Sequence, residues 1–402
     1  MTELLMPAIK AQKELYKKLG LRTRTLTLSV MVAIVVSMIW RQLGSGGSEI
    51  SRLLRSEGLL WVPVLHVSQQ AISERVRVFP SVLFLRILWY ILPFLHERWQ
   101  ARQRPLPPVL AWAQERYTAV LAADGSTLDA LLCKVGLLRD CDKHPLGGKM
   151  IAMLDLCSWL PRAIWYDEDA KASDQRFWPQ ILGAIPAGAL LLLDLGFTNF
   201  KMYARITNAT LVTRAKDNLS FQVKKVYLRD SQVQDLLVWI GKGEDRQLVR
   251  LVKVYYEGEW YRYLTNELDP DVLPAFYVAA LYRQRWRIED AFNVAKRLLN
   301  LAYFWTGSQH GVQLQIWATW ILYAILVDLT DMVAEVLVRP FVHVSMEMVY
   351  RGLYYFSRAF ARGEASDPAT YLAVNASWLG IIKRRHKASP LRLANLTSSG
   401  GP

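Results

Sequence analysis

The segment Leu281–Leu299, LYRQRWRIEDAFNVAKRLL, governs how the rest of this chain is interpreted. No Gly or Pro occurs from Ala275 to Asn300, so an unbroken helix is expected there. Four polar side chains, at offsets of zero, three, seven and fourteen residues, fall within roughly 60° of arc on such a helix. They are Tyr282, Arg285, Glu289 and Lys296. The opposite side offers apolar residues to a core, namely Ile288, Phe292, Leu298 and Leu299.

This stripe of an aromatic hydroxyl, two cations and a carboxylate has two interpretations. A carboxylate between two cations suits a metal ligand beside a phosphate backbone, because Arg and Lys hold phosphates and Tyr donates to them or stacks. An amphipathic surface helix with an ion pair between Arg285 and Glu289, one turn apart, accounts for the same residues. The choice between these interpretations depends on residues earlier in the chain.

Length and charge narrow the class of protein. The chain has 402 residues, enough for a large core and for more than one domain. Its formal net charge of +14 favours nucleic acid or an anionic membrane as a partner. The three cysteines, Cys133, Cys141 and Cys157, lack the spacing of a zinc site or a disulfide framework, which fits a reducing cytoplasm.

Two apolar segments could be mistaken for targeting or membrane sequences. Leu26–Trp40, LTLSVMVAIVVSMIW, is about 15 residues long, whereas a membrane-spanning helix needs roughly 20. No Ala-x-Ala cleavage pattern follows it. Val82–Leu95 is similar but is interrupted by Arg86. We therefore expect buried helices and no membrane partner.

Residues 1–108 are expected to form a helical, DNA-binding N-terminal domain. Residues 48–55 and 67–79 resemble the two helices of a helix-turn-helix, and the second contains Gln and Arg side chains that could read bases. Short polar helices are common, so this signal is weak. The segment RPLPP at 104–108 is expected to be a linker.

Beyond the linker the pattern becomes strand-like, which predicts the first part of an α/β core at residues 109–216. Its five strands are expected at 117–123, 149–156, 162–166, 189–193 and 210–214, and its helices at 170–182 and 200–206. This order predicts a mixed sheet. Three further parts follow: a β-rich insertion at 217–266, the second part of the core at 267–345, and a helical C-terminal region with a basic tail at 346–402.

Two aspartates follow predicted strands of this core. Asp124 and Asp194 each have a glycine within two residues after them. A single strand-end Asp usually only forms a turn. Two of them together with Glu289 would bring three carboxylates to one sheet edge, where they would repel each other without a divalent cation. That arrangement suits two-metal phosphoryl transfer, and its oxygen ligands favour Mg²⁺ or Mn²⁺.

With these residues the chain resembles a DDE-type transposase of a bacterial insertion sequence. The resemblance is to the large group marked by Tyr-x2-Arg-x3-Glu-x6-Lys, called insertion sequence four-like. Tyr282–Lys296 matches that signature at every spacing. Asp124 in Asp-Gly-Ser-Thr and Asp194 in Asp-Leu-Gly-Phe match the two Asp blocks of the family. The resemblance covers about residues 110–330.

The resemblance implies an RNase H-like core in which Asp124, Asp194 and Glu289 bind two Mg²⁺ ions, with Mn²⁺ as a substitute. It implies hydrolysis at the ends of the element and transesterification that joins the 3′-hydroxyl ends to target DNA. The implied partners are double-stranded DNA, both the terminal inverted repeats and the target, and a second copy of the chain in a synaptic homodimer. The implied location is the bacterial cytoplasm, at the nucleoid.

The resemblance also implies which side chains contact DNA. Three on the quoted helix would hold the end of the element and any flipped base: Tyr282, Arg285 and Lys296. A Trp of the insertion stacks near such a base in relatives; Trp260 is the candidate here and Trp239 the alternative. Arg214 and Lys216 could contact phosphates where core and insertion join, although solvated charge is an equal alternative.

Other functions are compatible with part of this pattern. A metal-dependent nuclease on the same fold would share the first step without strand transfer. A DNA-binding derivative without activity is disfavoured, because all three acidic positions are intact. His310, and His144 beside Asp140 and Asp142, are expected to be ordinary loop residues.

Overall fold

A computed structural model describes residues 1–43, 47–128, 148–301 and 304–383. Within these ranges the chain has a mixed α/β fold built on one nine-stranded mixed sheet, in the order β3-β2-β1-β4-β5-β9-β8-β7-β6. The strands are β1 (Val120–Thr127), β2 (Lys149–Asp155), β3 (Pro161–Asp167), β4 (Leu190–Leu193), β5 (Thr210–Arg214), β6 (Phe221–Arg229), β7 (Val233–Ile240), β8 (Gln247–Tyr256) and β9 (Glu259–Thr265). The predicted α/β class with a mixed sheet is confirmed.

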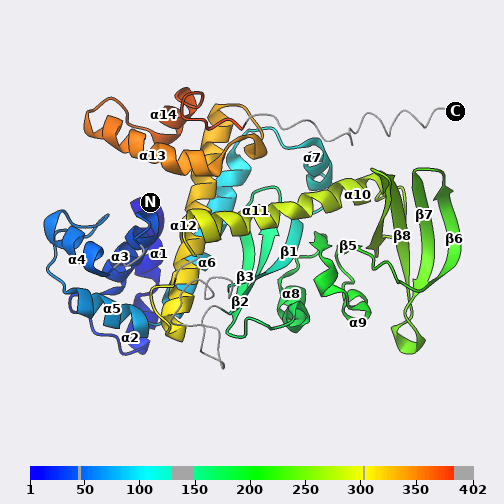
Figure 1. Cartoon of the computed structure of the whole chain (residues 1–402), viewed down its shortest axis with the longest axis horizontal. Helices are drawn as coiled ribbons and strands as arrows, with labels where there is room; N and C mark the ends of the chain where they lie inside the picture. The colour runs from blue at the N-terminus through cyan, green and yellow to red at the C-terminus, as the bar shows by residue number, and fades with distance from the viewer. Residues whose placement is uncertain (44–46, 129–147, 302–303, 384–402) are drawn as a thin grey trace.

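The first five strands include both parallel and antiparallel pairs. β1 pairs in parallel with β4, and β4 with β5, whereas β2 and β3 are antiparallel to their neighbours. β5 then pairs with β9 in antiparallel fashion, so the β-rich segment extends the same sheet (Figure 1). The carboxyl ends of β1 and β4 therefore meet at one edge, as expected for neighbouring parallel strands.

Side chains alternate between the two faces of the sheet, as strand geometry requires. Along β1, Val120 and Ala122 join the main hydrophobic cluster, whereas Leu121 and Ala123 join a second one. The second cluster lies under α8 (Trp178–Ala184) and α9 (Phe200–Tyr203). The main cluster lies under α11 (Arg287–Asn293) and α12 (Gln309–Val336). An even-numbered side chain of β1, such as Asp124, therefore points toward α11.

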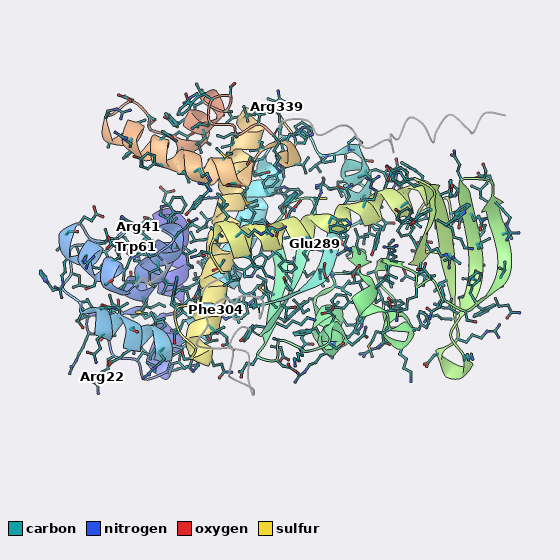
Figure 2. The ribbon with its side chains drawn as sticks, viewed as in Figure 1. Arg22, Arg41, Trp61, Glu289, Phe304 and Arg339 are labelled. Atoms are coloured by element: carbon teal, nitrogen blue, oxygen red, sulfur yellow. The ribbon has the colours of Figure 1, made fainter. Side chains whose placement is uncertain are left out.

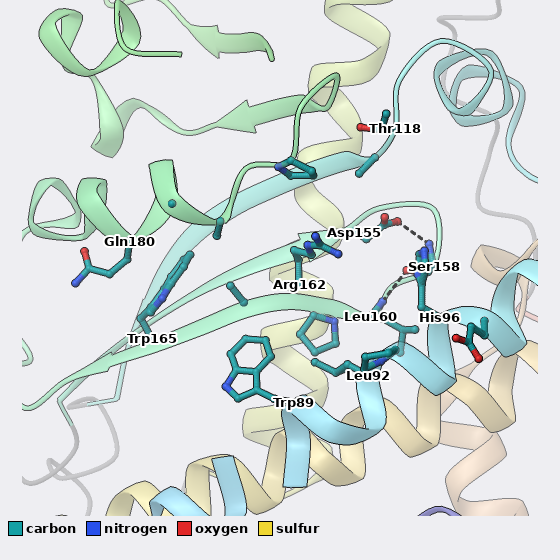
Figure 3. A pocket seen from close by; sticks show the side chains of 18 residues that line it. Trp89, Leu92, His96, Thr118, Asp155, Ser158, Leu160, Arg162, Trp165 and Gln180 are labelled. Carbon is teal, nitrogen blue, oxygen red and sulfur yellow. Dashed lines mark hydrogen bonds between the residues drawn. The ribbon is translucent and has the colours of Figure 1, made fainter. Parts of the chain in front are cut away.

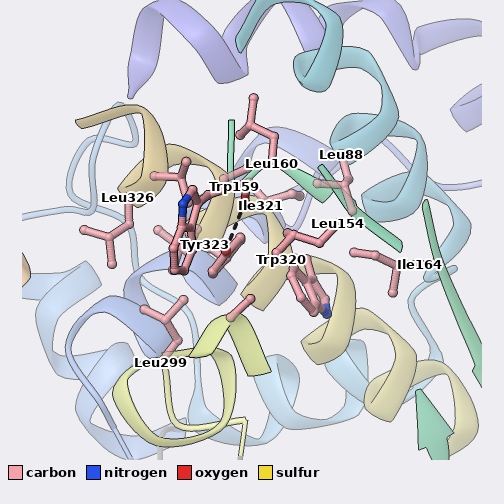
Figure 4. Close-up of a cluster of buried hydrophobic side chains, with 14 of the residues drawn as sticks. Leu88, Leu154, Trp159, Leu160, Ile164, Leu299, Trp320, Ile321, Tyr323 and Leu326 are labelled. Atoms are coloured by element: carbon pink, nitrogen blue, oxygen red, sulfur yellow. Dashed lines mark hydrogen bonds between the residues drawn. The ribbon is translucent and has the colours of Figure 1, made fainter. Parts of the chain in front are cut away.

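The N-terminal part of the chain is helical and packs on α12. Its helices are α1 (Thr2–Ala11), α2 (Lys13–Lys18), α3 (Leu28–Trp40), α4 (Gly47–Ser56), α5 (Gln69–Val78), α6 (Val82–Ala101) and α7 (Pro108–Gln114). Side chains of α3, α5 and α6 share the main cluster with α12 and the sheet. Figure 4 shows this junction, where Tyr323 of α12 donates a hydrogen bond of 3.0 Å to the carbonyl of Trp159. The predicted domain boundary at residue 108 stays a prediction, because the main hydrophobic cluster contains side chains from both sides of it.

The apolar segments are helices inside this core. α3 is buried along most of its length, as its composition predicts. α12 is long and apolar enough to cross a membrane, but 78% of its most apolar window is buried inside the protein. α5 and α6 together pass the same test of length and composition, with a bend of 76° between them. Burial of α12 to this extent is typical of a core helix.

The helix expected to be unbroken from Ala275 to Asn300 departs twice from α-helical geometry. It consists of α10 (Ala275–Arg283), a 3₁₀ turn at Gln284–Trp286, α11, and a π turn at Val294–Leu298. The absence of Gly and Pro therefore predicts continuity but not regularity. Residues i and i+3 eclipse in a 3₁₀ turn, and this tighter turn brings Tyr282 and Arg285 toward the same side. The apolar side is buried as expected, with Ile288 fully enclosed.

Three other expectations need correction. Asp124 lies inside β1, because β1 continues to Thr127 by pairing with β2. The helix expected at 170–182 is a 3₁₀ helix, η3 (Asp174–Phe177), followed by α8. α7 was not expected. The C-terminal region forms α13 (Met346–Ala361) and α14 (Pro368–Val374), and the tail beyond Lys383 lies outside the described residues, as do Cys133, Cys141 and His144.

Candidate active site

Three carboxylates come together where β1, β4 and α11 meet. Ala123 and Leu193 are aligned partners of the parallel β1–β4 pair, and Asp124 and Asp194 are the next residue on each chain. Neighbouring strands lie about 4.8 Å apart, so this register places the two aspartates side by side. Glu289 comes from α11, which crosses the same sheet (Figure 2).

The guanidinium of Arg285 connects all three carboxylates. Its Nη1 lies 2.6 Å from Asp124 Oδ2, and its Nη2 lies 3.2 Å from Glu289 Oε1 and 3.5 Å from Asp194 Oδ1. The Arg285 side chain is only 6% exposed, whereas those of Asp194 and Glu289 are 39% and 35% exposed. The cluster is therefore buried around Arg285 and open to solvent on the side of Asp194 and Glu289.

Burial has the largest effect on the pKa of the Asp124 carboxyl. It raises the pKa of this carboxyl to about 6, and the nearby charges of Asp194 and Glu289 act in the same direction. Arg285 and the backbone N–H of Gly125, which donates to Asp124 Oδ1 over 2.7 Å, oppose the rise but do not cancel it. A buried carboxyl with a raised pKa among other titratable groups is typical of functional sites.

Tyr282 lies on the Asp194 side of the cluster. Its hydroxyl donates to Asp194 Oδ1 over 3.3 Å, and its ring packs against that of Tyr263 on β9. Burial raises the pKa of this hydroxyl, so it stays protonated and can donate a hydrogen bond. Tyr282 and Arg285, expected on the DNA-facing stripe, thus both contact the acidic residues directly.

Lys296, the last residue of the signature, lies at the far end of β1. Its Nζ donates to the backbone oxygen of Thr127 over 2.8 Å. The π turn that contains Lys296 therefore connects the end of the signature helix to the end of β1. The structure brings all four signature side chains to the edge that holds Asp124, where Lys296 contacts the backbone of β1.

The remaining predicted DNA contacts differ in their distance from the carboxylates. Arg214 follows Thr213, the aligned partner of Leu193, so it lies next to Asp194 at the same edge of the sheet. Trp260 on β9 is partly exposed and packs against Tyr255. Trp239 on β7 is also partly exposed, with the cations of Lys224 and Arg246 over its ring. Arg214 and Lys216 are exposed beside a pocket of about 410 Å³ at the junction of β5 and the insertion. Their DNA contacts stay predictions.

The three carboxylates suit a hard divalent cation by their chemistry. They supply only oxygen donors, which Mg²⁺ and Mn²⁺ prefer, and they already share one positively charged group. Within the described ranges, no three acidic, His or Cys side chains are close enough together to hold one ion. Arg285 lies between the acidic groups, so an ion would have to replace its contacts with at least one of them.

A larger pocket lies elsewhere, at the opposite end of β1. It has a volume of about 800 Å³ and lies between α6 and the start of β3, near Thr118 and Arg162 (Figure 3). Thr118 precedes Asp124 by six residues, or about 20 Å of extended strand. The size of a pocket therefore does not identify the acidic cluster, which is recognised by its charges and its position on the sheet.

Sequence reasoning missed two side chains near this cluster. Asp174 of η3 lies against the glycines that follow Asp124 and Asp194, and Lys149 of β2 forms an ion pair with it. Neither has a signal in the sequence, because Asp174 follows no predicted strand and Lys149 only begins one.

An α/β sheet with three acidic residues at one edge is an arrangement that suits metal-dependent cutting and joining of phosphodiester bonds. Residues 136–325 match a family model described as "Transposase DDE domain". This range is slightly less than half of the chain and contains Asp194 and Glu289, but it begins after Asp124. These residues are therefore similar to a transposase DDE domain.

One curated relative has a similar sequence. It is described as "Putative transposase y4zB" from Sinorhizobium fredii (strain NBRC 101917 / NGR234). The two are 30% identical over 193 residues, which are 45% of this chain and 52% of the relative. The chain thus spans about half the length of the relative it matches. The resemblance to DDE-type transposases is confirmed, whereas membership in the group with the Tyr-Arg-Glu-Lys signature stays a prediction.

Proposed function

We propose that this protein is a DNA transposase that cuts the ends of an insertion sequence and joins them to target DNA. The observation that carries the proposal is the convergence of Asp124, Asp194 and Glu289 around one guanidinium, in a chain whose residues 136–325 match a transposase DDE domain. The core is proposed to be RNase H-like, and the N-terminal helices to bind DNA.

Asp124, Asp194 and Glu289 are the residues that would hold two Mg²⁺ ions, or Mn²⁺ in their place. When bound, these ions lower the pKa of water and stabilise charge on the attacking and leaving oxygens. Asp194 and Glu289 are the more exposed ligands, so they would face the DNA. Asp124, buried at the base of the site, would fix the position of the cluster.

Arg285 and Tyr282 would hold the acidic residues in place before DNA binds. Arg285 neutralises part of their negative charge, and Tyr282 orients Asp194 by its hydrogen bond. On binding DNA, the same guanidinium and hydroxyl would donate to a phosphate of the element's end. Lys296 would add a positive charge at the end of β1.

The proposed partners are the terminal inverted repeats, the target DNA and a second copy of this chain in the synaptic complex. The net charge of +14 supports an anionic partner. The bacterial cytoplasm, at the nucleoid, is the proposed location.

The test combines the DNA around the gene with an assay of strand transfer. Short inverted repeats bracketed by a direct duplication are expected around the gene. A duplex that ends in this repeat should be cut with Mg²⁺ and joined to a plasmid by the purified protein. Cutting of unrelated duplexes at equal rates, without joining, would identify a metal-dependent nuclease instead. Specific binding without cutting would identify a DNA-binding derivative.

A further inference from the structure

Asp174, a fourth acidic residue, lies between the two segments that carry Asp124 and Asp194. It begins η3, which belongs to the face of the sheet opposite α11, since Phe177 of the same short helix joins the second hydrophobic cluster. Its side chain is 21% exposed. Lys149 Nζ, from β2, lies 2.5 Å from Asp174 Oδ1. The pair is therefore close to the acidic cluster but approaches it from the other side of the sheet.

Each oxygen of this carboxylate faces one glycine of the two Asp segments. A methyl group added at Gly125, the residue after Asp124, would overlap Asp174 Oδ1. A methyl group added at Gly196, two residues after Asp194, would lie 2.6 Å from Asp174 Oδ2, closer than side chains approach one another. Neither glycine has a positive φ. Both positions therefore need glycine for space. At Gly196 the three nearest atoms all belong to Asp174, whereas at Gly125 Ile151 and Lys149 fill the space together with Asp174.

The residue after Asp174 holds the Asp194 segment directly. Gln175 Nε2 donates to the carbonyl oxygen of Gly196 over 2.6 Å, and Gln175 Oε1 accepts from Asn199 Nδ2 over 3.1 Å. η3 is thus fixed to the Asp194 segment through Gln175 and to the sheet through the ion pair between Asp174 and Lys149.

The sheet places the two aspartates side by side but does not fully fix the distance between their segments. The aligned pairing of β1 and β4 ends at Ala123 and Leu193, one residue before each aspartate. Beyond that point β1 stays paired with β2 on its other side, but the Asp194 segment leaves β4 as a 3₁₀ turn. The exact separation of Asp124 and Asp194 therefore also depends on what fills the space between the two segments.

We propose that Asp174, anchored by Lys149, is a positioning residue that sets the separation of Asp124 and Asp194 for divalent-cation binding. The inference rests on the proposed function, because it assumes that these two aspartates hold the cations. Residues that orient metal ligands without touching the metal commonly change affinity by about 10- to 100-fold when removed. Asp174 occupies space, so a side chain of the same shape should preserve the separation.

The first experiment measures how Mn²⁺ raises the unfolding temperature of the full chain, for wild type, Asp174→Ala and Asp174→Asn. The exposed Asp271→Ala, in the loop before α10, is the matched control. Asp174→Ala is expected to need at least about tenfold more Mn²⁺ for half of the full shift, whereas Asp174→Asn and the control stay near wild type. Unchanged Mn²⁺ dependence in Asp174→Ala would overturn the proposal. An equal loss in Asp174→Asn would also overturn it, because Asn keeps the shape of the side chain and an oxygen that can accept a hydrogen bond from Lys149.

The second experiment is a double-mutant cycle that needs neither metal nor DNA. Gly196→Ala alone should lower the unfolding temperature, because the three atoms nearest to the added methyl group all belong to Asp174. In the Asp174→Ala background, the same change should cost much less, which is the signature of a direct contact. Additive effects would overturn the proposed packing. If the cycle shows coupling but wild type has no Mn²⁺-dependent shift, the proposed function fails while the contact stands.

Discussion

Replacing Arg285 by Met tests the charge balance of the acidic cluster. Methionine keeps much of the volume of the side chain but removes the positive charge. Asp124 is 16% exposed and loses a contact of 2.6 Å, whereas Asp194 and Glu289 are more than a third exposed. Exposed ion pairs contribute little because solvent screens them, so the loss should come mainly from Asp124.

The magnitude follows from the cost of leaving one buried charge without its partner, about 3–5 kcal/mol. With only one buried partner, we expect Arg285→Met to lower the free energy of unfolding by about 3 kcal/mol at about pH 8 without divalent ions. Burial already raises the pKa of Asp124 to about 6. At about pH 5 this carboxyl is mostly protonated in both proteins, so the loss should shrink to about 1 kcal/mol.

The assay is urea unfolding followed by tryptophan fluorescence, at both pH values and with a chelator present. Arg297→Met, an exposed position in the π turn that follows α11, is the control and should change stability by less than about 0.5 kcal/mol. An equal loss at both pH values would refute the electrostatic reasoning, because packing alone does not titrate. A more stable variant at the higher pH would refute it as well.

Three further predictions concern buried acidic groups. The folded-state pKa of Asp124, about 6, exceeds the ordinary value of 3.8. Wild type should therefore lose up to about 3 kcal/mol of stability as pH rises from about 4 to above 6 without divalent ions, and Asp124→Asn should not; parallel pH profiles would contradict this. Asp331→Ala removes a carboxylate that is 1% exposed and forms an ion pair with Arg102. This change should lower the free energy of unfolding by about 3–5 kcal/mol, measured by urea unfolding. Asp235→Ala removes the carboxylate that pairs with the fully buried Arg250, which keeps its hydrogen bonds to backbone carbonyls. This change should make the β-rich segment sensitive to limited proteolysis; wild-type resistance would count against it.

The sheet and its acidic residues could be predicted from the sequence because the signals are local. Leu190–Leu193 is a continuous apolar run, as expected for a buried parallel strand, and Asp194 follows it directly. The spacing of Arg285 and Glu289 by four residues gives a neighbouring pair on any helix. These features depend on backbone periodicity, which neighbouring residues largely determine.

The inward direction of the signature side chains could not be predicted in the same way. Helical spacing puts Arg285 and Glu289 on one face, but only the position of Asp124 on β1 shows that this face is buried. The 3₁₀ and π turns depend on the same tertiary contacts. The role of Asp174 is even harder to predict from the sequence. Its partners Gly125, Lys149 and Gly196 are distant in sequence and are brought together only by the fold.

The measurement closest to the central claim is cleavage of the element's end by single carboxylate variants. Glu289→Gln preserves the size of the side chain and its position on α11 while removing the negative charge that a divalent cation requires. We predict that this variant binds the inverted-repeat duplex like wild type but does not cut it with Mg²⁺ or Mn²⁺. Mg²⁺-dependent cutting at the wild-type rate would contradict the assignment of Asp124, Asp194 and Glu289 as the metal-binding site.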